Sequence, residues 1–185
     1  GGGRKSGCML CAGQLQLLGP GPSMRIFKSK SKQKEAVQFD VQLPAAAPTQ
    51  SGIAIAVIVR DEAHAIAEWI DYHKAAGVDH FILYDDDSQD DTMAIARCCL
   101  AIDQITIVPW RQRLQDARFG RALHNQGLAF GHAASNFCHF RWIAFTDVDE
   151  FIYPTSASSI PEVLVQLEAA DSIYMNWMMF GRQGF

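Results

Sequence analysis

From residue 53 onward, apolar residues gather into short runs that alternate with stretches of helical periodicity. The first run, IAIAVIV at Ile53–Val59, is β-branched and lacks the alternation of a half-exposed strand. Such a run is typical of a strand buried on both faces, as in a parallel sheet. HFILYD (His80–Asp85), ITIVPW (Ile105–Trp110) and the apolar stretch Trp142–Phe145 predict three more strands, and SIYMNWMMF (Ser172–Phe180) predicts a fifth.

The stretches between these runs predict helices. The first extends from about Glu62 to Ala76, with Asp61 as its N-cap and Gly77 as its stop. Others are expected over about 92–101 and 119–137, and from about Ser159, where Pro161 suits a first turn. Strands and helices that alternate with short connections predict an α/β fold built on a parallel sheet.

The amino-acid composition changes at about residue 50. Residues 1–50 are rich in Gly, Pro, Ser, Lys and Ala and predict a disordered basic leader and linker, which leaves 51–185 as one domain. The net charge of the whole chain is −4, whereas residues 1–34 contain Lys and Arg but no acid. The leader could contact an anionic membrane surface peripherally, although a solvated tail is favoured. Without a long apolar segment, a cytoplasmic location is expected, with membrane association through the leader left open, and no nucleic-acid partner is expected.

Carboxylates follow three of the predicted strands: Asp61 and Glu62 the first, Asp85, Asp86 and Asp87 the second, and Asp147 and Asp149 the fourth. Parallel strands end at the same edge of a sheet, where ligands of such folds bind. Carboxylates that are close together repel one another, and a divalent cation would balance them. Two acids one residue apart offer oxygen ligands that suit Mg²⁺ or Mn²⁺, although acidic pairs at strand ends are often only solvated turns.

Several motifs occur in an order that resembles glycosyltransferase family 92, the DUF23-like group related to family 2 enzymes of the GT-A fold. They are RDEA, EWIDYH, GVDHF, DDDSQDDT, WIAFTDVDEF and FGRQGF, spread over Ile53 to Phe185. The resemblance implies a GT-A (Rossmann-like), mostly parallel sheet flanked by helices. It also implies a chain truncated at its C-terminus, because the motifs end in what resembles the middle of the family's domain.

The same resemblance implies transfer of a sugar, with inversion and the help of Mn²⁺ or Mg²⁺, from a nucleotide sugar such as a UDP-sugar. The acceptor would be a hydroxyl of a glycan, lipid or protein. Asp149 would bind the metal, with Asp147 on the ribose or a metal-bound water. Asp85, Asp86 and Asp87 would contact the nucleoside, Asp61 and Glu62 would lie beside the uridine, and the catalytic base would lie beyond Phe185.

Three alternatives stay open from the residues alone. The chain could be a nucleotide-sugar-binding fragment without turnover, or a structural Ca²⁺-binding module. A phosphatase of the haloacid dehalogenase type also uses DxD after a buried strand, but the motif then lies early in the domain and precedes a Gly-Thr-type turn. Here Glu150, Phe151 and Ile152 follow it. The six histidines form no compact ligand motif, so each is expected to be a surface or packing residue.

Overall fold

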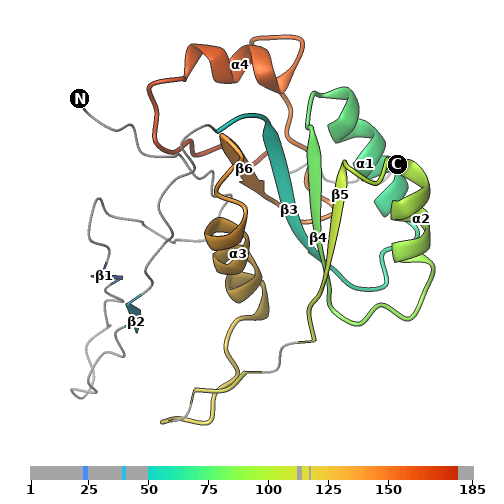
Figure 1. Ribbon diagram of the computed structural model, residues 1–185, viewed down its shortest axis with the longest axis vertical. Helices are drawn as coiled ribbons and strands as arrows, with labels where there is room; N and C mark the ends of the chain where they lie inside the picture. Colours follow the sequence, from blue (N-terminus) through green and yellow to red (C-terminus); the bar gives the residue numbers. More distant parts are fainter. Residues whose placement is uncertain (1–22, 25–38, 41–49, 112–113, 117, 179–185) are drawn as a thin grey trace, which may run out of the picture.

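The computed structural model describes residues 23–24, 39–40, 50–111, 114–116 and 118–178. Four strands form its main sheet: β3 (Ile53–Val59), β4 (His80–Asp85), β5 (Ile105–Pro109) and β6 (Trp142–Phe145). All neighbouring pairs are parallel, in the order β5-β4-β3-β6. These strands confirm the predicted α/β fold class, with a Rossmann-like core (Figure 1).

Both faces of this sheet are covered, which explains why its strands show no polar alternation (Figure 1). Ile55 and Val57 of β3 face a core formed with α1 (Ile66–Ala75), α2 (Thr92–Cys99) and α4 (Ile160–Gln166). Ala54 and Ala56, on the opposite face of β3, pack in a second core with α3 (Asn125–Asn136). The small alanine side chains are fully buried beneath α3.

The path of the chain reverses at β3. It proceeds through α1 to β4 and through α2 to β5 in one direction, with both helices on one face. It then crosses through α3 on the other face and returns to pair β6 with the free side of β3. The carboxyl ends of β3 and β6 therefore flank a topological switch point, where open α/β sheets bind their ligands.

Two predicted helices begin later than their sequences indicate. Asp61 adopts a positive φ of 55°, so it turns the chain instead of capping a helix, and α1 begins at Ile66 after a turn. The predicted helix over 119–137 starts only at Asn125, because Gly120 also has a positive φ and the preceding segment folds back on itself. Gly77, at a φ of 100°, ends α1 as predicted.

The predicted fifth strand is not formed in its described part, residues 172–178. Ile173 and Met175 pack against the first core, whereas Tyr174, Trp177 and Met178 are exposed. The alternation suits a strand, but a strand also needs a partner, and neither sheet edge pairs with this segment.

The leader predicted for residues 1–50 lies outside the described residues, apart from Gln50 and a two-residue antiparallel pairing of β1 (Ser23–Met24) with β2 (Phe39–Asp40). Its disorder therefore stays a prediction. Across the described part of the chain, no helix has the length and apolar character that a membrane span requires.

Candidate functional site

A tight turn presents the two carboxylates that follow β6. The Glu150 amide donates to the Asp147 carbonyl oxygen at 3.1 Å, and the Asp147 amide donates to Glu150 Oε2 at the same distance. Val148 between them is buried in the first core, which leaves Asp149 exposed at the tip of the turn. We call residues 147–150 the DxD turn. Its two hydrogen bonds hold the backbone of the turn. The Asp149 side chain is exposed, so a ligand in solvent can reach its carboxylate.

The Asp147 carboxylate is held from the opposite side of the sheet. Gln126, in the first turn of α3, donates its side-chain amide to Asp147 Oδ1. Burial and then the charge of Asp149 raise the pKa of Asp147, while the Gln126 hydrogen bond and the proximity of His124 act in the lowering direction. The effect of Asp149 means that the two carboxylates interact electrostatically. A bound cation would therefore stabilise both in their charged form.

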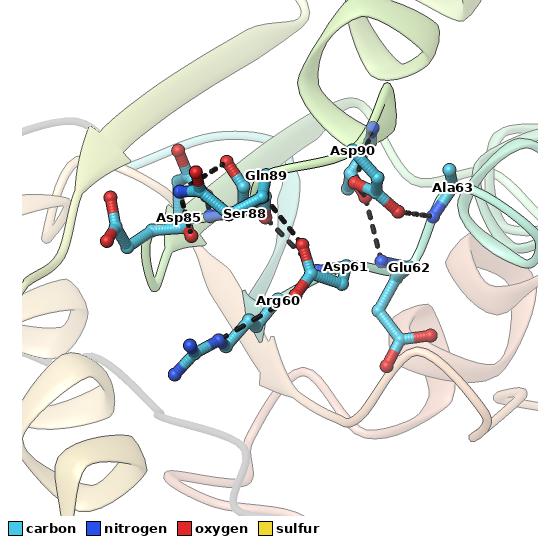
Figure 2. A network of polar contacts seen from close by, with 10 residues as sticks. Arg60, Asp61, Glu62, Ala63, Asp85, Ser88, Gln89 and Asp90 are labelled. Carbon is cyan, nitrogen blue, oxygen red and sulfur yellow. Dashed lines mark hydrogen bonds and ion pairs between the residues drawn. The ribbon is translucent and has the colours of Figure 1, made fainter.

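Four hydrogen bonds join the loop after β3 to the loop after β4 (Figure 2). Asp61 Oδ1 accepts from the Gln89 amide at 2.7 Å, and the Asp61 amide donates to Ser88 Oγ at 3.3 Å. The Glu62 amide donates to the fully buried Thr92 Oγ1 at 2.8 Å. Asp90 Oδ2 accepts the fourth hydrogen bond, from the amide of residue 63, at 3.0 Å. The two loops therefore form one rigid unit, which we call the loop clip.

The remaining acids of the second loop also have defined partners. Asp85 Oδ1 accepts from the Ser88 amide at 2.9 Å, and the Asp86 amide donates to the Val59 carbonyl oxygen at 2.9 Å. Asp87, with a positive φ of 68°, forms an ion pair with Arg111, in which Asp87 Oδ1 lies 2.8 Å from Arg111 Nη2. The loop after β4 thus partly neutralises its own charge with an arginine that follows β5.

The predicted site residues all lie at or just beyond the carboxyl ends of β3, β4 and β6, at one edge of the parallel sheet, and Asp85 is itself the last residue of β4. The loop clip contains the predicted residues at the ends of β3 and β4, and the DxD turn contains the two predicted residues that follow β6. In the part of the chain that is described, no three His, Cys, Asp or Glu side chains are grouped so as to hold a metal ion. Among these described residues, no more than two such side chains are placed to bind one ion together.

Sequence reasoning missed two residues that shape this site. Glu150 stands three residues after Asp147, a spacing at which a carboxylate can bond back to a backbone amide, so a local signal existed. Gln126 is 21 positions from Asp147, and nothing in the sequence around it indicates the contact. Only the crossing of α3 to the other face of the sheet brings it there.

Comparisons with known proteins agree with one another. The model of the family described as glycosyltransferase family 92 matches residues 52–183. The chain is 29% identical over 122 residues to a galactan β-1,4-galactosyltransferase, GALS2, from Arabidopsis thaliana, with 64% of this chain and 23% of that protein covered. It is 28% identical over 131 residues to a glycosyltransferase family 92 protein from Ricinus communis, with 65% and 21% covered.

A family 92 protein from Oryza sativa is 25% identical over 116 residues, with 60% of this chain and 18% of that protein covered. The chain thus spans about a fifth of the length of the curated relatives that it matches. No solved structure matches it significantly.

Proposed function

The chain belongs to glycosyltransferase family 92, and on that premise we propose that the carboxyl edge of its sheet binds the nucleoside diphosphate of a UDP-sugar. In the whole protein this donor would supply a sugar to a hydroxyl of a glycan, lipid or protein, with inversion at the anomeric carbon. The chain described here would supply the donor half of that site.

One observation carries the proposal: the DxD turn lies at the switch point between β3 and β6, with the loop clip on the neighbouring strands. Ligands of open α/β sheets bind in this position. The Asp61 and Asp85 carboxylates already accept backbone amides, so we infer that they shape the loops on which a nucleoside would rest. Glu62, Asp86 and Asp87 would line the same part of the site.

A divalent ion fits this arrangement. Mg²⁺ and Mn²⁺ need oxygen ligands, and Mg²⁺ in nucleotide sites is typically held by one or two carboxylates with phosphate oxygens and water completing its shell. Asp149 is exposed and would bind the ion directly, while Asp147, fixed by Gln126, would bind it directly or through water. When bound, such an ion stabilises the negative charge that develops on the leaving diphosphate.

The proposal is tested by calorimetric titration of UDP into the purified chain, with and without Mn²⁺. Asp149→Asn keeps the shape of the side chain but removes its charge. Asp103→Asn, an exposed aspartate just before β5 at the opposite edge of the sheet, is the matched control. We expect Mn²⁺-dependent binding that Asp149→Asn abolishes and Asp103→Asn retains. Binding that ignores Mn²⁺, or that survives Asp149→Asn, would contradict the assignment.

Turnover is a separate question from binding. Because one relative is named as a galactan β-1,4-galactosyltransferase, UDP-galactose is the first donor to test in a turnover assay. Release of UDP from the sugar nucleotide, followed with a coupled assay, would identify a catalytic chain. Metal-dependent binding without UDP release would identify a donor-binding half whose catalytic base lies elsewhere, and binding of Ca²⁺ with no nucleotide preference would favour a structural metal module.

A further inference from the structure

Three side chains on one face of α1 hold the backbone that follows the DxD turn. Trp69 Nε1–H donates to the Glu150 carbonyl oxygen at 3.0 Å, and the Tyr72 hydroxyl donates to the Ile152 carbonyl oxygen at 3.2 Å. The Ile152 amide in turn donates to Nε2 of His73, also at 3.2 Å. Positions 69, 72 and 73 have the i, i+3, i+4 spacing that places side chains on one helix face. These contacts join elements about 80 positions apart along the chain.

The hydrogen bonds of His73 fix its tautomer. Because the Ile152 amide donates to Nε2, the ring proton is on Nδ1, which lies 2.9 Å from the Trp69 carbonyl oxygen. Burial lowers the pKa of this imidazole to about 4, so the ring is neutral at physiological pH. His73 is thus a packing residue, as expected from the sequence, and it also acts as a specific acceptor for one backbone amide.

Aromatic contacts reinforce the same junction. The His73 ring stacks on Phe151 at 5.8 Å between centroids and 10° between planes. Tyr72 meets Phe151 edge-on at 5.0 Å. The fully buried Trp69 packs against His73 at 4.7 Å and against Phe81 of β4 at 5.8 Å. The segment after the turn is therefore fixed by ring packing as well as by hydrogen bonds.

We propose that Trp69, Tyr72 and His73 of α1 are positioning residues for the DxD turn. They hold the backbone of residues 150–152, and Glu150 passes this constraint to Asp147 through its bond to the Asp147 amide. Loss of one of these contacts lets the turn move, so that Asp147 and Asp149 meet the ligand in the wrong geometry. No α1 side chain needs to touch the ligand. This inference rests on the proposed function of the same site.

Two variants each remove one contact between α1 and the segment after the turn, and His73→Phe also removes the hydrogen bond within α1 to the Trp69 carbonyl oxygen. Tyr72→Phe deletes one hydroxyl group, and His73→Phe keeps an aromatic ring against Phe151 but removes the acceptor of the Ile152 amide. Ile70→Val is the matched control: Ile70 is buried on α1, so the variant loses core packing but no polar contact with the turn. Asp71→Asn is an exposed control on the same helix. All four variants are made in the 185-residue chain.

Two readouts are needed: the affinity for UDP with saturating Mn²⁺, and hydrogen–deuterium exchange of residues 147–152. We expect each aromatic variant to weaken binding about fivefold, the effect of one hydrogen bond. In His73→Phe the exchange rate of the Ile152 amide should rise about tenfold. The exchange rates of the β3 amides should rise less. Ile70→Val should lose stability but keep its affinity, whereas a purely structural role for α1 would make affinity follow stability in the same way in all the variants.

The inference is overturned if exchange at Ile152 does not change in His73→Phe, because α1 then does not hold the turn. It is equally overturned if exchange rises but affinity does not change, or if Ile70→Val weakens binding as much as the aromatic variants do. Failure of the wild-type chain to bind UDP under any condition is a different result. It contradicts the proposed function, and exchange at Ile152 then decides alone whether α1 holds the turn.

Discussion

Val148 gives the two carboxylates beside it different surroundings. Its side chain is buried in the first core, so the side chains of Asp147 and Asp149 point away from that core. The hydrogen bond from the Asp147 amide to Glu150 holds the backbone of the turn. Asp147 is half-buried and bonded to Gln126, while Asp149 is exposed. Two identical side chains one residue apart are therefore suited to different tasks, one fixed in orientation and the other open to a ligand.

Gln126→Ala tests this division. The change removes the donor that orients Asp147 and leaves both carboxylates in place. Because outer contacts of metal ligands commonly change metal affinity by about 10- to 100-fold, we expect Mn²⁺-dependent UDP binding to weaken by about tenfold. Gln166→Ala, an exposed glutamine on α4, should bind like the wild type. Equal affinity in both variants would show that Asp147 needs no support from α3.

His73 predicts a pH dependence of stability. Its pKa is lowered by burial from 6.5 to about 4 in the folded chain, so below pH 6.5 the unfolded chain binds the additional proton. Stability from this residue is complete above pH 6.5 and falls with pH down to about 4. At pH 5 the loss is about 2 kcal/mol relative to pH 7.5. The free energy of unfolding in urea at both pH values measures it.

Carboxylates titrate in the same range, so the comparison must be with variants that keep every carboxylate. His73→Phe should lose about 2 kcal/mol less than the wild type between pH 7.5 and pH 5, whatever its absolute stability. Ile70→Val, which alters the core packing of the same helix and removes no titratable group, should keep the wild-type dependence. If His73→Phe and the wild type respond equally to acid, the imidazole is not buried neutral.

The sequence predicts where the acidic residues lie in the sheet, but it does not predict which groups they bond to. Each of the seven predicted site residues lies at or just beyond the end of a strand at the expected edge, because a buried parallel strand can be recognised in the sequence as an apolar run. Their partners were not visible. Asp61 was expected to cap a helix, yet it accepts the Gln89 amide, a contact that depends on how two loops meet in space.

At the scale of elements, Thr92→Val examines the loop clip. Thr92 is fully buried at the start of α2, and its hydroxyl accepts the Glu62 amide and donates to Asp90. Valine keeps the shape but leaves a backbone amide without its acceptor, which costs about 1–3 kcal/mol. Thr155→Val, at an exposed position, should have little effect. Chemical unfolding measures both, and equal stabilities would mean that the clip does not hold the two loops.

Two glycines, Gly77 between α1 and α4 and Gly131 inside α3, give opposite predictions. At Gly77, φ is 100° and an added Cβ would lie 2.6 Å from Pro161 Cδ, so Gly77→Ala should destabilise the chain by about 2 kcal/mol or more. Gly131 lies inside α3 with no atom within 4 Å of the added Cβ, so Gly131→Ala should stabilise by about 0.5–1 kcal/mol. Melting temperatures that move in the same direction would contradict this account.

Strands were predictable and helix starts were not, for a physical reason. β3 and β4 have the predicted bounds, because the buried positions of a strand covered on both faces are apolar: all of β3 is apolar, and so are the four central positions of β4. The start of α1 depends on the left-handed backbone of Asp61, which aspartate tolerates better than most residues and whose side chain is held by the Gln89 amide. Residues 172–178 were predicted to form a strand and do not. Alternation of apolar and polar residues shows which side of a strand would be buried, but it does not show which strand it would pair with.

At the scale of the whole molecule, the switch point joins two independently packed cores. Val148 belongs to the core beneath α1, whereas Gln126 comes from α3 on the other face. Asp147 is therefore held from both sides of the sheet. A ligand that binds Asp147 and Asp149 engages groups anchored in both cores, and because it binds only the folded chain, it should stabilise the molecule as one unit.

The expected result is an upward shift in the melting temperature of the 185-residue chain when UDP and Mn²⁺ are added together. At a UDP concentration about 100 times its dissociation constant, the gain is about 2.7 kcal/mol. For a chain of this size that corresponds to roughly 5–10 °C. Mn²⁺ or UDP alone should produce a much smaller shift, and Asp149→Asn should abolish the joint effect. A shift of the same size in Asp149→Asn would place the nucleotide elsewhere on the molecule, because a ligand that does not use the DxD turn cannot distinguish the two chains.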